Sequence, residues 1–516
     1  MEKQNSADIN DGCLFSRRSI LKGAGAGGFL LAMQWEIRKA FASQQFDVIV
    51  IGGGTAGIPT AIFAADRGAR VLIIEKAPRL GGTLYMSHGE MAAANTVFQK
   101  RRGIDDSPDA FYDDIMRING NTSDPVLTRL WAEHGGETVN WLARNGFTVP
   151  DGVPVRGKSF DFFSTARYLW GPQQGVSIFS VMQPLLSQHV QAGRVSVLTD
   201  TGAVDLIKDR TGAVRGVVAE ASDGKRSDFR GLNVVITSGG CAANPAMFED
   251  IHGVPLYSQF ANPYGQGTGL VLGLGAGGYL RGAENCINSF GSITADDTIP
   301  SPLVASMSLS PRTRPPWEVF VNAHGDRFVQ EDHPSLAHRG RTLGLQPGHR
   351  FWAIFDQHIF EQAPPLINSW PRDKLLQAFN HHPMFWRAPS LGELGVKAGI
   401  HPSRLERSIG AYNMALTKNE PDPFNRAYRP EPISKPPFYA IRSQGWTLKS
   451  FAGVAVNNDL QVMTAEGLTI SNLYAAGEVL GGGSTGGKAY TGGSNVTPAL
   501  TFGRLLGQKI LQFSGV

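Results

Sequence analysis

Two glycine-rich segments at opposite ends of the chain contain the residues best suited to hold a ligand through the backbone. The first contains Gly52, Gly54 and Gly57 in GxGxxG spacing. The second runs from Gly477 to Gly503 with nine glycines in 27 residues, and a single tyrosine, Tyr490, lies within it. Because glycine loses more backbone entropy on folding than any other residue, such clusters are typical of places where the backbone approaches a ligand closely. We therefore predict that both segments build one ligand site.

The first glycine segment is expected to lie between a strand and a helix. Residues 46–51 form a β-branched apolar run typical of a buried parallel strand, and a helix is predicted for residues 58–67. A second strand, residues 70–74, is followed by Glu75. Glu75 lies 18 residues after Gly57, close to the spacing of about 20 residues at which an acidic residue binds a ribose hydroxyl. Since the free N–H groups of a helix N-terminus favour a pyrophosphate, this arrangement predicts a dinucleotide site.

Two more segments favour FAD over NAD as the dinucleotide. Residues 79–83 (RLGGT) follow the second strand, and their glycines let the chain turn back over the pyrophosphate, which NAD enzymes rarely need. Residues 234–240 form another apolar strand that ends in two glycines. The cofactor-binding residues predicted from these segments are Gly52, Gly54, Thr55, Ala56, Gly57, Glu75, Lys76, Gly82, Thr83, Gly239 and Gly240.

Composition excludes several other classes. The 516 residues allow two to four domains, and the formal net charge is only +4 without basic blocks, so no nucleic-acid partner is expected. Three cysteines with no CxxC or zinc spacing predict neither a disulfide framework nor a metal, haem or iron–sulfur site.

The first 42 residues are interpreted as a targeting segment. Arg17 and Arg18 precede the small and apolar residues 23–33 and the sequence AFA at 40–42, a pattern similar to a twin-arginine signal with its cleavage site. The apolar stretch is too short to span ~30 Å of hydrocarbon. We therefore expect a partner in the twin-arginine translocase and a periplasmic or otherwise exported enzyme.

Beyond these local patterns, the chain resembles the superfamily of FAD-dependent fumarate reductases, succinate dehydrogenases and 3-ketosteroid dehydrogenases. The motifs that carry the resemblance occur in family order: GGGTAG (52–57), EKAPRLGGT (75–83), GIDDSPDAFYDD (103–114), VITSGGCAANPAMF (235–248), VNAHGDRFVQED (321–332), LGELGVKAGIHPSRLERSIGAYN (391–413), NLYAAGEV (472–479) and TFGR (501–504).

The resemblance implies an α/β fold in which an α+β capping domain interrupts a Rossmann-like FAD-binding domain. The FAD-binding domain would comprise residues 43–284 and 436–516, and the capping domain residues 285–435, with a small-molecule substrate held between them at the flavin. It further implies that Gly477 and Glu478 lie near the ribityl chain, and that Ser494, Asn495 and Val496 lie near the pyrimidine edge of the flavin.

The chemistry at the flavin distinguishes two subfamilies. The front half resembles the fumarate reductases through GGTLYMSHGEMAAANT (81–96), in which His88 and Glu90 replace small residues and are candidates to shape the pocket. However, Ser335 and Tyr490 stand where that subfamily has two arginines that bind a dicarboxylate. Lys449 or Leu448, in TLKSFAG (447–453), stands where it has a histidine that does so. A dicarboxylate would lose its charge-assisted pairs here.

The C-terminal pattern is closer to that of the ketosteroid dehydrogenases. By this resemblance, the Tyr490 hydroxyl and the Ser494 N–H would hold a ring carbonyl of the substrate. The tyrosine that acts as general base in that subfamily is absent, because Ser335 stands at its position as well. His333, or as second choice His338, would serve as general base. Lys449 is a candidate to contact a substrate carboxylate or carbonyl. Each residue has a plainer interpretation: Tyr490 packs against the flavin, His333 caps a turn, and Lys449 is solvated.

Our leading hypothesis from the sequence is an exported FAD-dependent dehydrogenase of a cyclic ketone, with a separate electron partner such as a quinone, a cytochrome or O2. The alternative is a periplasmic reductase of an unsaturated carboxylate that receives electrons from a separate cytochrome. A flavin electron carrier without a substrate is the third possibility. A carrier needs no cap, whereas residues 285–435 are assigned to one.

Overall fold

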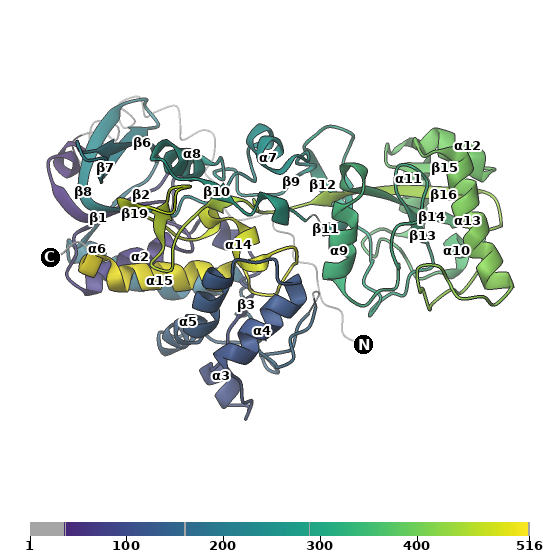
Figure 1. The fold of residues 1–516 in the computed structure, drawn as a ribbon, viewed down its shortest axis with the longest axis horizontal. Coiled ribbons are helices and arrows are strands. Elements are labelled where there is room, and N and C mark those ends of the chain that lie inside the picture. Colours follow the sequence, from purple (N-terminus) through teal and green to yellow (C-terminus); the bar gives the residue numbers. More distant parts are fainter. Residues whose placement is uncertain (1–35, 37, 159–160, 288, 514–516) are drawn as a thin grey trace, which may run out of the picture.

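The structure is a computed structural model that describes residues 36, 38–158, 161–287 and 289–513. The twin-arginine motif at Arg17 and Arg18 lies outside these residues. Figure 1 shows an elongated molecule with two sheets, one near each end. The long strand β16 (Phe438–Trp446) reaches from the far sheet toward the C-terminal glycine segment.

The first sheet contains the strands that sequence periodicity predicts. Strand β1 pairs in parallel with β2 on one side and β8 on the other, and β2–β5 and β8–β19 are also parallel. The central strand β2 and residues 48–51 of β1 are apolar without alternation, as expected for parallel strands that are covered on both faces. The sheet order is β18 (Gln461–Met463), β19 (Thr469–Ala475), β8 (Arg226–Ile236), β1 (Gln45–Ile51), β2 (Val71–Ile74) and β5 (Val195–Leu198), with β6 (Thr201–Lys208) and β7 (Val214–Ala221) attached to β8.

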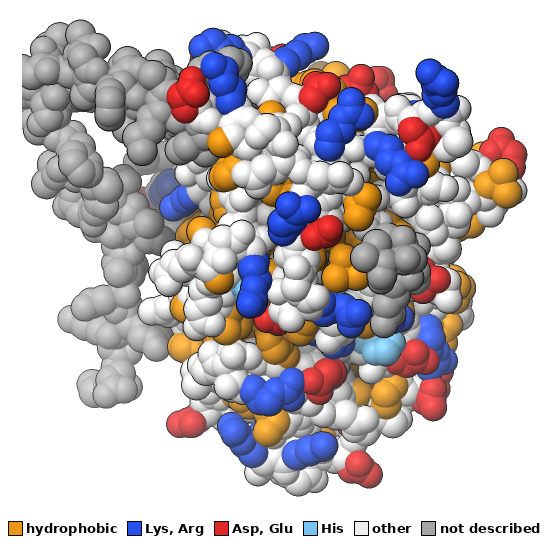
Figure 2. All heavy atoms as spheres, turned by 90° about the vertical axis from the view of Figure 1, so that its left-hand side faces the viewer, with side chains coloured by type: hydrophobic (Ala, Val, Ile, Leu, Met, Phe, Trp, Pro, Cys, Tyr) orange, Lys and Arg blue, Asp and Glu red, His pale blue; other side chains and the backbone are white. Residues whose placement is uncertain are grey.

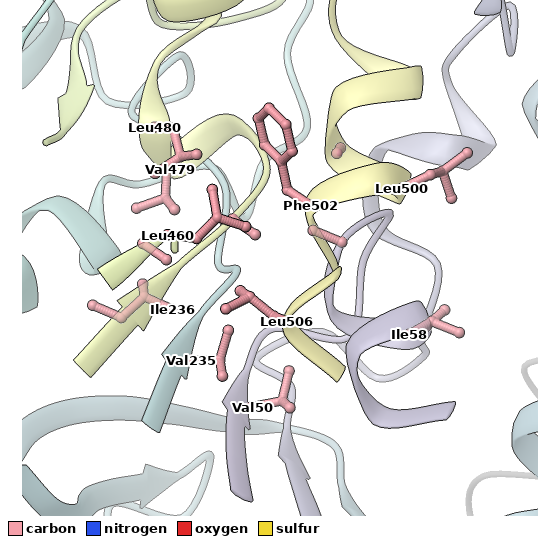
Figure 3. Packing of buried hydrophobic residues seen from close by; sticks show 14 of the residues in the cluster. Val50, Ile58, Val235, Ile236, Leu460, Val479, Leu480, Leu500, Phe502 and Leu506 are labelled. Atoms are coloured by element: carbon pink, nitrogen blue, oxygen red, sulfur yellow. The ribbon is translucent and has the colours of Figure 1, made fainter. Parts of the chain in front are cut away.

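Helices α2 (Gly57–Asp66) and α15 (Val496–Phe513) pack against each other beneath this sheet (Figure 1). Figure 3 shows side chains from β1, α2, β8 and α15 in one hydrophobic cluster. The remaining elements of this part are α3 (Val97–Lys100), α4 (Pro108–Asn119), α5 (Pro125–Arg144), α6 (Gly175–Gln191), α7 (Pro245–His252), α8 (Thr268–Gly275), α14 (Gly482–Gly486), the 3-10 turns η2 (Gly82–Tyr85), η3 (Ala283–Asn285) and η5 (Glu478–Leu480), and the strand pairs β3 (Met91–Ala92) with β4 (Tyr168–Leu169) and β10 (Leu280–Arg281) with β17 (Gly453–Val454).

The second sheet has its own hydrophobic core, formed by buried residues between Ile293 and Ile441. Its strand order is β13 (Val319–Val321), β14 (Arg350–Asp356), β16, β11 (Ser289–Thr294), β12 (Ser301–Ser306) and β9 (Ser258–Gln259), with β15 (Phe385–Ala388) also paired to β16. The helical elements around it are α9 (Leu336–Gly344), η4 (Pro347–His349), α10 (Gln357–Gln362), α11 (Arg372–His381), α12 (Leu391–Ala398) and α13 (Pro402–Thr417). The overall α/β fold class predicted from the sequence is confirmed.

The limits of the capping domain, residues 285–435, stay a prediction. Strand β16 extends the second sheet to Trp446, and β9 joins this sheet from residues before 285. We therefore propose that the chain returns from the capping domain to the FAD-binding domain after residue 446, and not after residue 435.

The surface charges, the helices and the groups of possible metal ligands were compared with what a nucleic acid, a membrane or a metal ion would need. On the face drawn in Figure 2, Lys and Arg side chains are interspersed with Asp and Glu side chains. None of the described helices is both long and apolar enough to span a membrane. Within the described ranges, no group of three or more His, Cys, Asp or Glu residues is arranged to hold a metal ion.

Candidate active site

The GxGxxG turn is built by contacts that only glycine allows. Gly52 has a φ of +103°, and a Cβ on Gly57 would lie 1.9 Å from the Gly52 carbonyl oxygen. Gly54, in contrast, has no atom within 4 Å of the position of a Cβ, so its face is open. At Ala56, which precedes α2, no side chain accepts a hydrogen bond from the first N–H groups of the helix. Pro59 has no N–H, and the Ile58 N–H donates to the Gly54 carbonyl oxygen at 3.1 Å. The N-terminus of α2 therefore favours an anion mainly through the helix dipole.

Glu75 and the second glycine pair complete the turn. The Glu75 carboxylate accepts hydrogen bonds from the backbone N–H of Gly53 (2.8 Å) and of Ala77 (2.7 Å). Burial raises the pKa of Glu75, while these N–H groups act in the opposite direction. Gly81 donates its N–H to the Gly53 carbonyl oxygen, and a Cβ on Gly82 would lie 3.3 Å from the Gly54 Cα. The RLGGT segment thus returns to the first turn, as predicted. Thr83 is half-buried in η2, whereas Lys76 is exposed.

The third predicted glycine pair contacts the segment after β16. A Cβ on Gly240 would lie 1.8 Å from Ser450 Oγ, and this hydroxyl accepts the Cys241 N–H at 3.1 Å. The Ser450 N–H donates to Glu478 Oε1 at 3.0 Å. Gly239 has a φ of +79° and, like Gly54, no atom within 4 Å of a Cβ position.

The two ends of the chain meet at α2. A Cβ on Gly477 would lie 3.1 Å from the Ala56 Cβ, and a Cβ on Gly503 would lie 2.2 Å from the Ala56 carbonyl oxygen. The close packing of α15 against α2 therefore depends on glycine at residue 503. The prediction that the two glycine-rich segments come together is confirmed.

Lys449 is the buried cation of the site. Its side chain enters the C-terminal glycine run, where a Cβ on Gly482 would lie 2.9 Å from Nζ. Nζ donates to Asn495 Oδ1 at 3.0 Å and lies 5.7 Å from the centre of the Tyr490 ring. Among the described residues, no carboxylate forms a salt bridge with it. Burial lowers the pKa of Lys449 to about 8, against the opposing influence of Glu478 and Cys286.

Tyr490 is engaged by the segment that leads into β11. Its hydroxyl donates to the Ile287 carbonyl oxygen at 3.0 Å. Burial raises the pKa of Tyr490, partly offset by hydrogen bonding with Ser289 and Thr447. The tyrosine is therefore protonated at neutral pH. Its hydrogen bond joins the C-terminal glycine run to the segment before β11 of the second sheet.

The other residues predicted at the flavin edge lie at the start of α15. Val496 is its first residue and is buried, while Asn495 is exposed. The Ser494 N–H, expected to hold a carbonyl, donates to the Thr491 carbonyl oxygen at 3.2 Å, and the Ser494 side chain is buried.

His333 is part of the turn before α9. Its Nδ1 accepts the Ser335 N–H at 3.1 Å, and its ring stacks on His338 with 4.1 Å between centroids. Ser335, in turn, accepts the His338 N–H and bonds the Asp161 carboxylate. These contacts favour the interpretation of His333 as a turn residue. Its assignment as general base stays a prediction without support from the described contacts.

Comparison with known proteins identifies the family. The model of the FAD binding domain family matches residues 47–496, which is most of the chain. The chain belongs to the FAD binding domain family. It is a FAD-dependent oxidoreductase.

This FAD-binding protein is similar in sequence to fumarate reductases and similar in fold to a ketosteroid dehydrogenase. It is 29% identical to the NADH:fumarate oxidoreductase of Klebsiella pneumoniae, covering 91% of this chain and 48% of the relative, so it spans about half of that protein's length. It is 27% identical to the cytochrome-linked fumarate reductase of Shewanella frigidimarina, covering 91% of this chain and 77% of the relative. The 3-ketosteroid-Δ4-(5α)-dehydrogenase structure from Rhodococcus jostii superposes with a TM-score of 0.65 at 23% identity, covering 90% and 96% of the two chains.

The residues present fit FAD. At Gly54 and Gly239, no protein atom lies within 4 Å of the position that a Cβ would take, so this space is open to a ligand. At the start of α2, no side chain caps the helix. We expect the pyrophosphate at Gly52–Gly57, the ribose at Glu75, and the flavin between Gly477 and the start of α15. The individual contacts to FAD stay predictions.

Three residues of the site were missed by sequence reasoning. Ser450 joins the Gly240 turn to Glu478 through its hydroxyl and N–H. Cys286, considered only for disulfides, lies near both Lys449 and Tyr490, and burial raises its pKa to about 12. The Ile287 carbonyl holds Tyr490. Only Ser450 had a sequence signal, since it follows Lys449 in the TLKSFAG motif.

Proposed function

We propose that the protein reduces the double bond of an unsaturated monocarboxylate next to its carboxyl group, with the carboxylate bound by Lys449. The single observation that carries this proposal is the buried Lys449 ammonium, which lies within the glycine run and has no salt-bridge partner among the described residues. A buried charge without a counter-ion is costly, so a site of this kind favours an anionic ligand.

The number of cations limits the substrate. The residues at the positions of the fumarate-reductase clamp are Ser335, Tyr490 and Lys449, and only the last carries a positive charge. Ser335 is occupied as the N-cap of α9 and Tyr490 by the Ile287 carbonyl. One ammonium matches one carboxylate, and a second carboxylate would remain unpaired. We therefore favour a monocarboxylate over a dicarboxylate.

The residues have distinct parts in the proposed reaction. When FAD is bound and has been reduced by the separate electron partner, it would supply the hydride that the β-carbon of the double bond accepts. Lys449 binds the carboxylate and stabilises negative charge that develops on it during hydride addition. Tyr490 forms the wall beside Lys449 and, through Ile287, holds the capping sheet against the site. A proton taken up from solvent adds to the α-carbon and completes the saturated acid.

The second candidate function is the dehydrogenation of a cyclic ketone. It is favoured by the position of Tyr490. The hydroxyl of this residue is protonated, and the centre of its ring lies 5.7 Å from Lys449 Nζ. For this role, the hydroxyl would have to leave the Ile287 carbonyl, and the Ser494 N–H would have to leave Thr491. Two donors committed to backbone carbonyls make this the weaker candidate.

One anaerobic experiment separates the candidates. The holoenzyme is reduced with dithionite and mixed with crotonate, fumarate or 2-cyclohexenone while flavin absorbance is followed. We expect fast reoxidation by crotonate and slow reoxidation by the other two. Reoxidation by fumarate as fast as by crotonate would contradict the one-carboxylate assignment. Bleaching of the oxidised enzyme by a 3-ketosteroid, without reoxidation by crotonate, would establish the second candidate instead.

We also propose that the protein is exported by the twin-arginine route and exchanges electrons with a separate partner such as a cytochrome or quinone. The support is the sequence Ser16–Lys22 with the AFA site at 40–42. Changing Arg17 and Arg18 to lysine should retain the protein in the cytoplasm. Export of this variant at the wild-type level would refute the assignment.

A further inference from the structure

The backbone that carries Lys449 is fixed by hydrogen bonds from several segments. The Thr447 hydroxyl accepts the Lys449 N–H at 3.2 Å and donates to the Lys449 carbonyl oxygen at 2.8 Å. The Ser450 N–H donates to Glu478 Oε1 at 3.0 Å, and the Ser450 carbonyl oxygen accepts the Gly482 N–H at 2.9 Å. The position of the lysine side chain therefore depends on these neighbouring contacts.

His252 completes the set at the next residue, Phe451. The Phe451 carbonyl oxygen accepts the Gly483 N–H at 3.0 Å, and the Phe451 N–H donates to His252 Nε2 at 3.3 Å. The N–H and the carbonyl oxygen of each of residues 449–451 thus have a partner, as buried backbone groups require. Without the imidazole, the Phe451 N–H would be the group that loses its acceptor.

The other nitrogen of the His252 ring bonds a different segment. Nδ1 lies 3.4 Å from the Ala283 carbonyl oxygen. Because Nε2 accepts the Phe451 N–H, the neutral ring carries its proton on Nδ1 and donates it to Ala283. Burial lowers the pKa of His252 to about 4, while the Ala283 carbonyl acts in the opposite direction. The ring is therefore neutral at neutral pH, with one nitrogen as acceptor and the other as donor.

Two aromatic rings hold the imidazole in this orientation. Phe248, one helical turn earlier in α7, has its ring centre 4.5 Å from that of His252. The Phe451 ring lies 5.8 Å away at an interplanar angle of 87°. Both phenylalanines are 0% exposed. Because buried rings are close-packed, the two nitrogens stay aimed at Phe451 and Ala283.

The two segments that this imidazole joins both lead to the candidate active site. Ala283 begins η3, and four residues after it comes Ile287, whose carbonyl oxygen accepts the Tyr490 hydroxyl. In the other segment, Phe451 follows Lys449 by two residues. One side chain therefore connects the backbone that carries the buried ammonium to the backbone that holds the tyrosine.

We propose that His252 is a positioning residue that places Lys449 and Tyr490 relative to each other for binding the substrate carboxylate. It acts through the Phe451 N–H and the Ala283 carbonyl oxygen, and not through a contact of its own with the substrate. This inference rests on the function proposed for Lys449. Histidine suits the part because one rigid ring offers both a donor and an acceptor. Phenylalanine would fill a similar space but leave both backbone groups without their partner.

Three variants test this role in the holoenzyme. His252→Phe keeps a ring without polar atoms, and His252→Gln keeps a donor and an acceptor. His189→Phe is the matched control, because His189 is a buried histidine in the last turn of α6 that bonds Asp66 instead. In His252→Phe, the KM for crotonate should rise about tenfold while the kinetics of the uncharged 2-cyclohexenone change less than about threefold. His252→Gln should restore the KM for crotonate to within about threefold of wild type.

A second measurement needs no turnover. Trace labelling with acetic anhydride, followed by mass spectrometry of the Lys449 peptide, gives the pKa of this lysine in each variant. The pKa of Lys449 should be about 8 in the wild type. It should be about 9 or above in His252→Phe, because a loosened segment admits water to the ammonium. Glu478, Cys286 and the Tyr490 ring face Lys449 in every variant, so their influence is constant. The other two variants should keep the wild-type value.

Several outcomes would overturn the proposal. One is an unchanged pKa of Lys449 in His252→Phe, and another is an equal rise of the KM for crotonate in His189→Phe. If His252→Phe does not retain FAD, His252→Asn takes its place with the same expectations, because its amide is too short to reach Phe451. Loss of FAD from this variant as well would assign the residue to folding and also overturn the proposal. A raised Lys449 pKa in an enzyme that does not reduce crotonate would support the positioning of Lys449 and refute the proposed function instead.

Discussion

Replacing Lys449 with methionine should stabilise the protein while it removes activity. Burial lowers the pKa of Lys449 from 10.5 to about 8, and each pKa unit corresponds to about 1.4 kcal/mol. The charged side chain therefore costs on the order of 3 kcal/mol in the folded protein. Methionine has a similar length and no charge. It loses the hydrogen bond to Asn495, worth about 1 kcal/mol, so we expect a net gain of about 2 kcal/mol at pH 7.

The gain should disappear at high pH. Below about pH 8, Lys449 is charged in both the folded and the unfolded chain, so the full cost is present. Between pH 8 and 10.5, the folded chain loses this proton first, and the free energy of unfolding of the wild type rises. The difference between the variant and the wild type should therefore shrink across this interval. Denaturant unfolding at pH 7, 9 and 10.5, with matched ionic strength, measures it.

Activity should change in the opposite direction. Removing one partner of a buried ion pair costs about 3–5 kcal/mol, so kcat/KM for an unsaturated monocarboxylate should fall by roughly 10²–10⁴. For wild type, kcat/KM should decline as pH rises through about 8, since deprotonation removes the positive charge. An uncharged enone should show neither effect. Lys418→Met, at an exposed helix end, is the matched control.

Two results would refute this reasoning. If Lys449→Met melts lower than wild type at pH 7, the lysine is held by interactions stronger than its burial cost. If the variant reduces crotonate at the wild-type rate, the ammonium does not bind the substrate carboxylate. The first result concerns only the energetics of burial, and the second removes the basis of the proposed function.

Four other substitutions test particular contacts. Gly57→Ala should prevent FAD retention and lower stability, because its Cβ would lie 1.9 Å from a backbone oxygen, whereas Gly54→Ala should fold normally and lose only FAD affinity; FAD content and circular dichroism compare them. His333→Ala should lower stability by about 1 kcal/mol through the lost turn hydrogen bond and leave kcat within a few-fold, and a hundredfold loss of kcat would restore it as general base. Asp161→Asn should increase hydrogen exchange at Ser335 and the start of α9, because the carboxylate accepts the Leu336 N–H at 2.8 Å; unchanged protection would show that this contact does not hold the helix.

The dinucleotide-binding half was predictable because its signals are local. Strand 46–51, the helix beginning near residue 58 and the strand ending at Glu75 each follow from a run of fewer than a dozen residues, and the structure places them within one residue of the expected limits. The glycine spacing itself reports backbone geometry, since Gly57 must lie against Gly52 for the turn to close. Local periodicity and steric necessity therefore suffice for this half.

Contacts between distant segments were not predictable in the same way. Ser450 meets Gly240 and Cys241 across 209 residues, and Tyr490 meets Ile287 across 203. No periodicity within either segment encodes such pairings, because they depend on how β16 and the C-terminal run cross between the two units. The role of Ser494 illustrates this limit: its N–H was expected to face a substrate carbonyl but donates to Thr491.

The residue that best separates the possible functions is Lys449, although the sequence pointed to Tyr490. Its position in the sequence suggested that Tyr490 stands in place of an arginine that binds a dicarboxylate. The tyrosine hydroxyl was expected to donate a hydrogen bond to a substrate carbonyl instead. In the structure, the Tyr490 hydroxyl already has an acceptor, so using it on a substrate requires breaking that bond. Lys449 bonds only a neutral amide, and its ammonium retains donors and charge for a ligand. Glu478 opposes the effect of burial on Lys449 but forms no salt bridge with it among the described residues, so the buried ammonium remains costly and a bound anion would lower that cost. A substrate carbonyl would have to break the Tyr490 hydrogen bond, whereas a carboxylate could bind Lys449 without breaking one. This difference, rather than the motif, makes a carboxylate the expected substrate group.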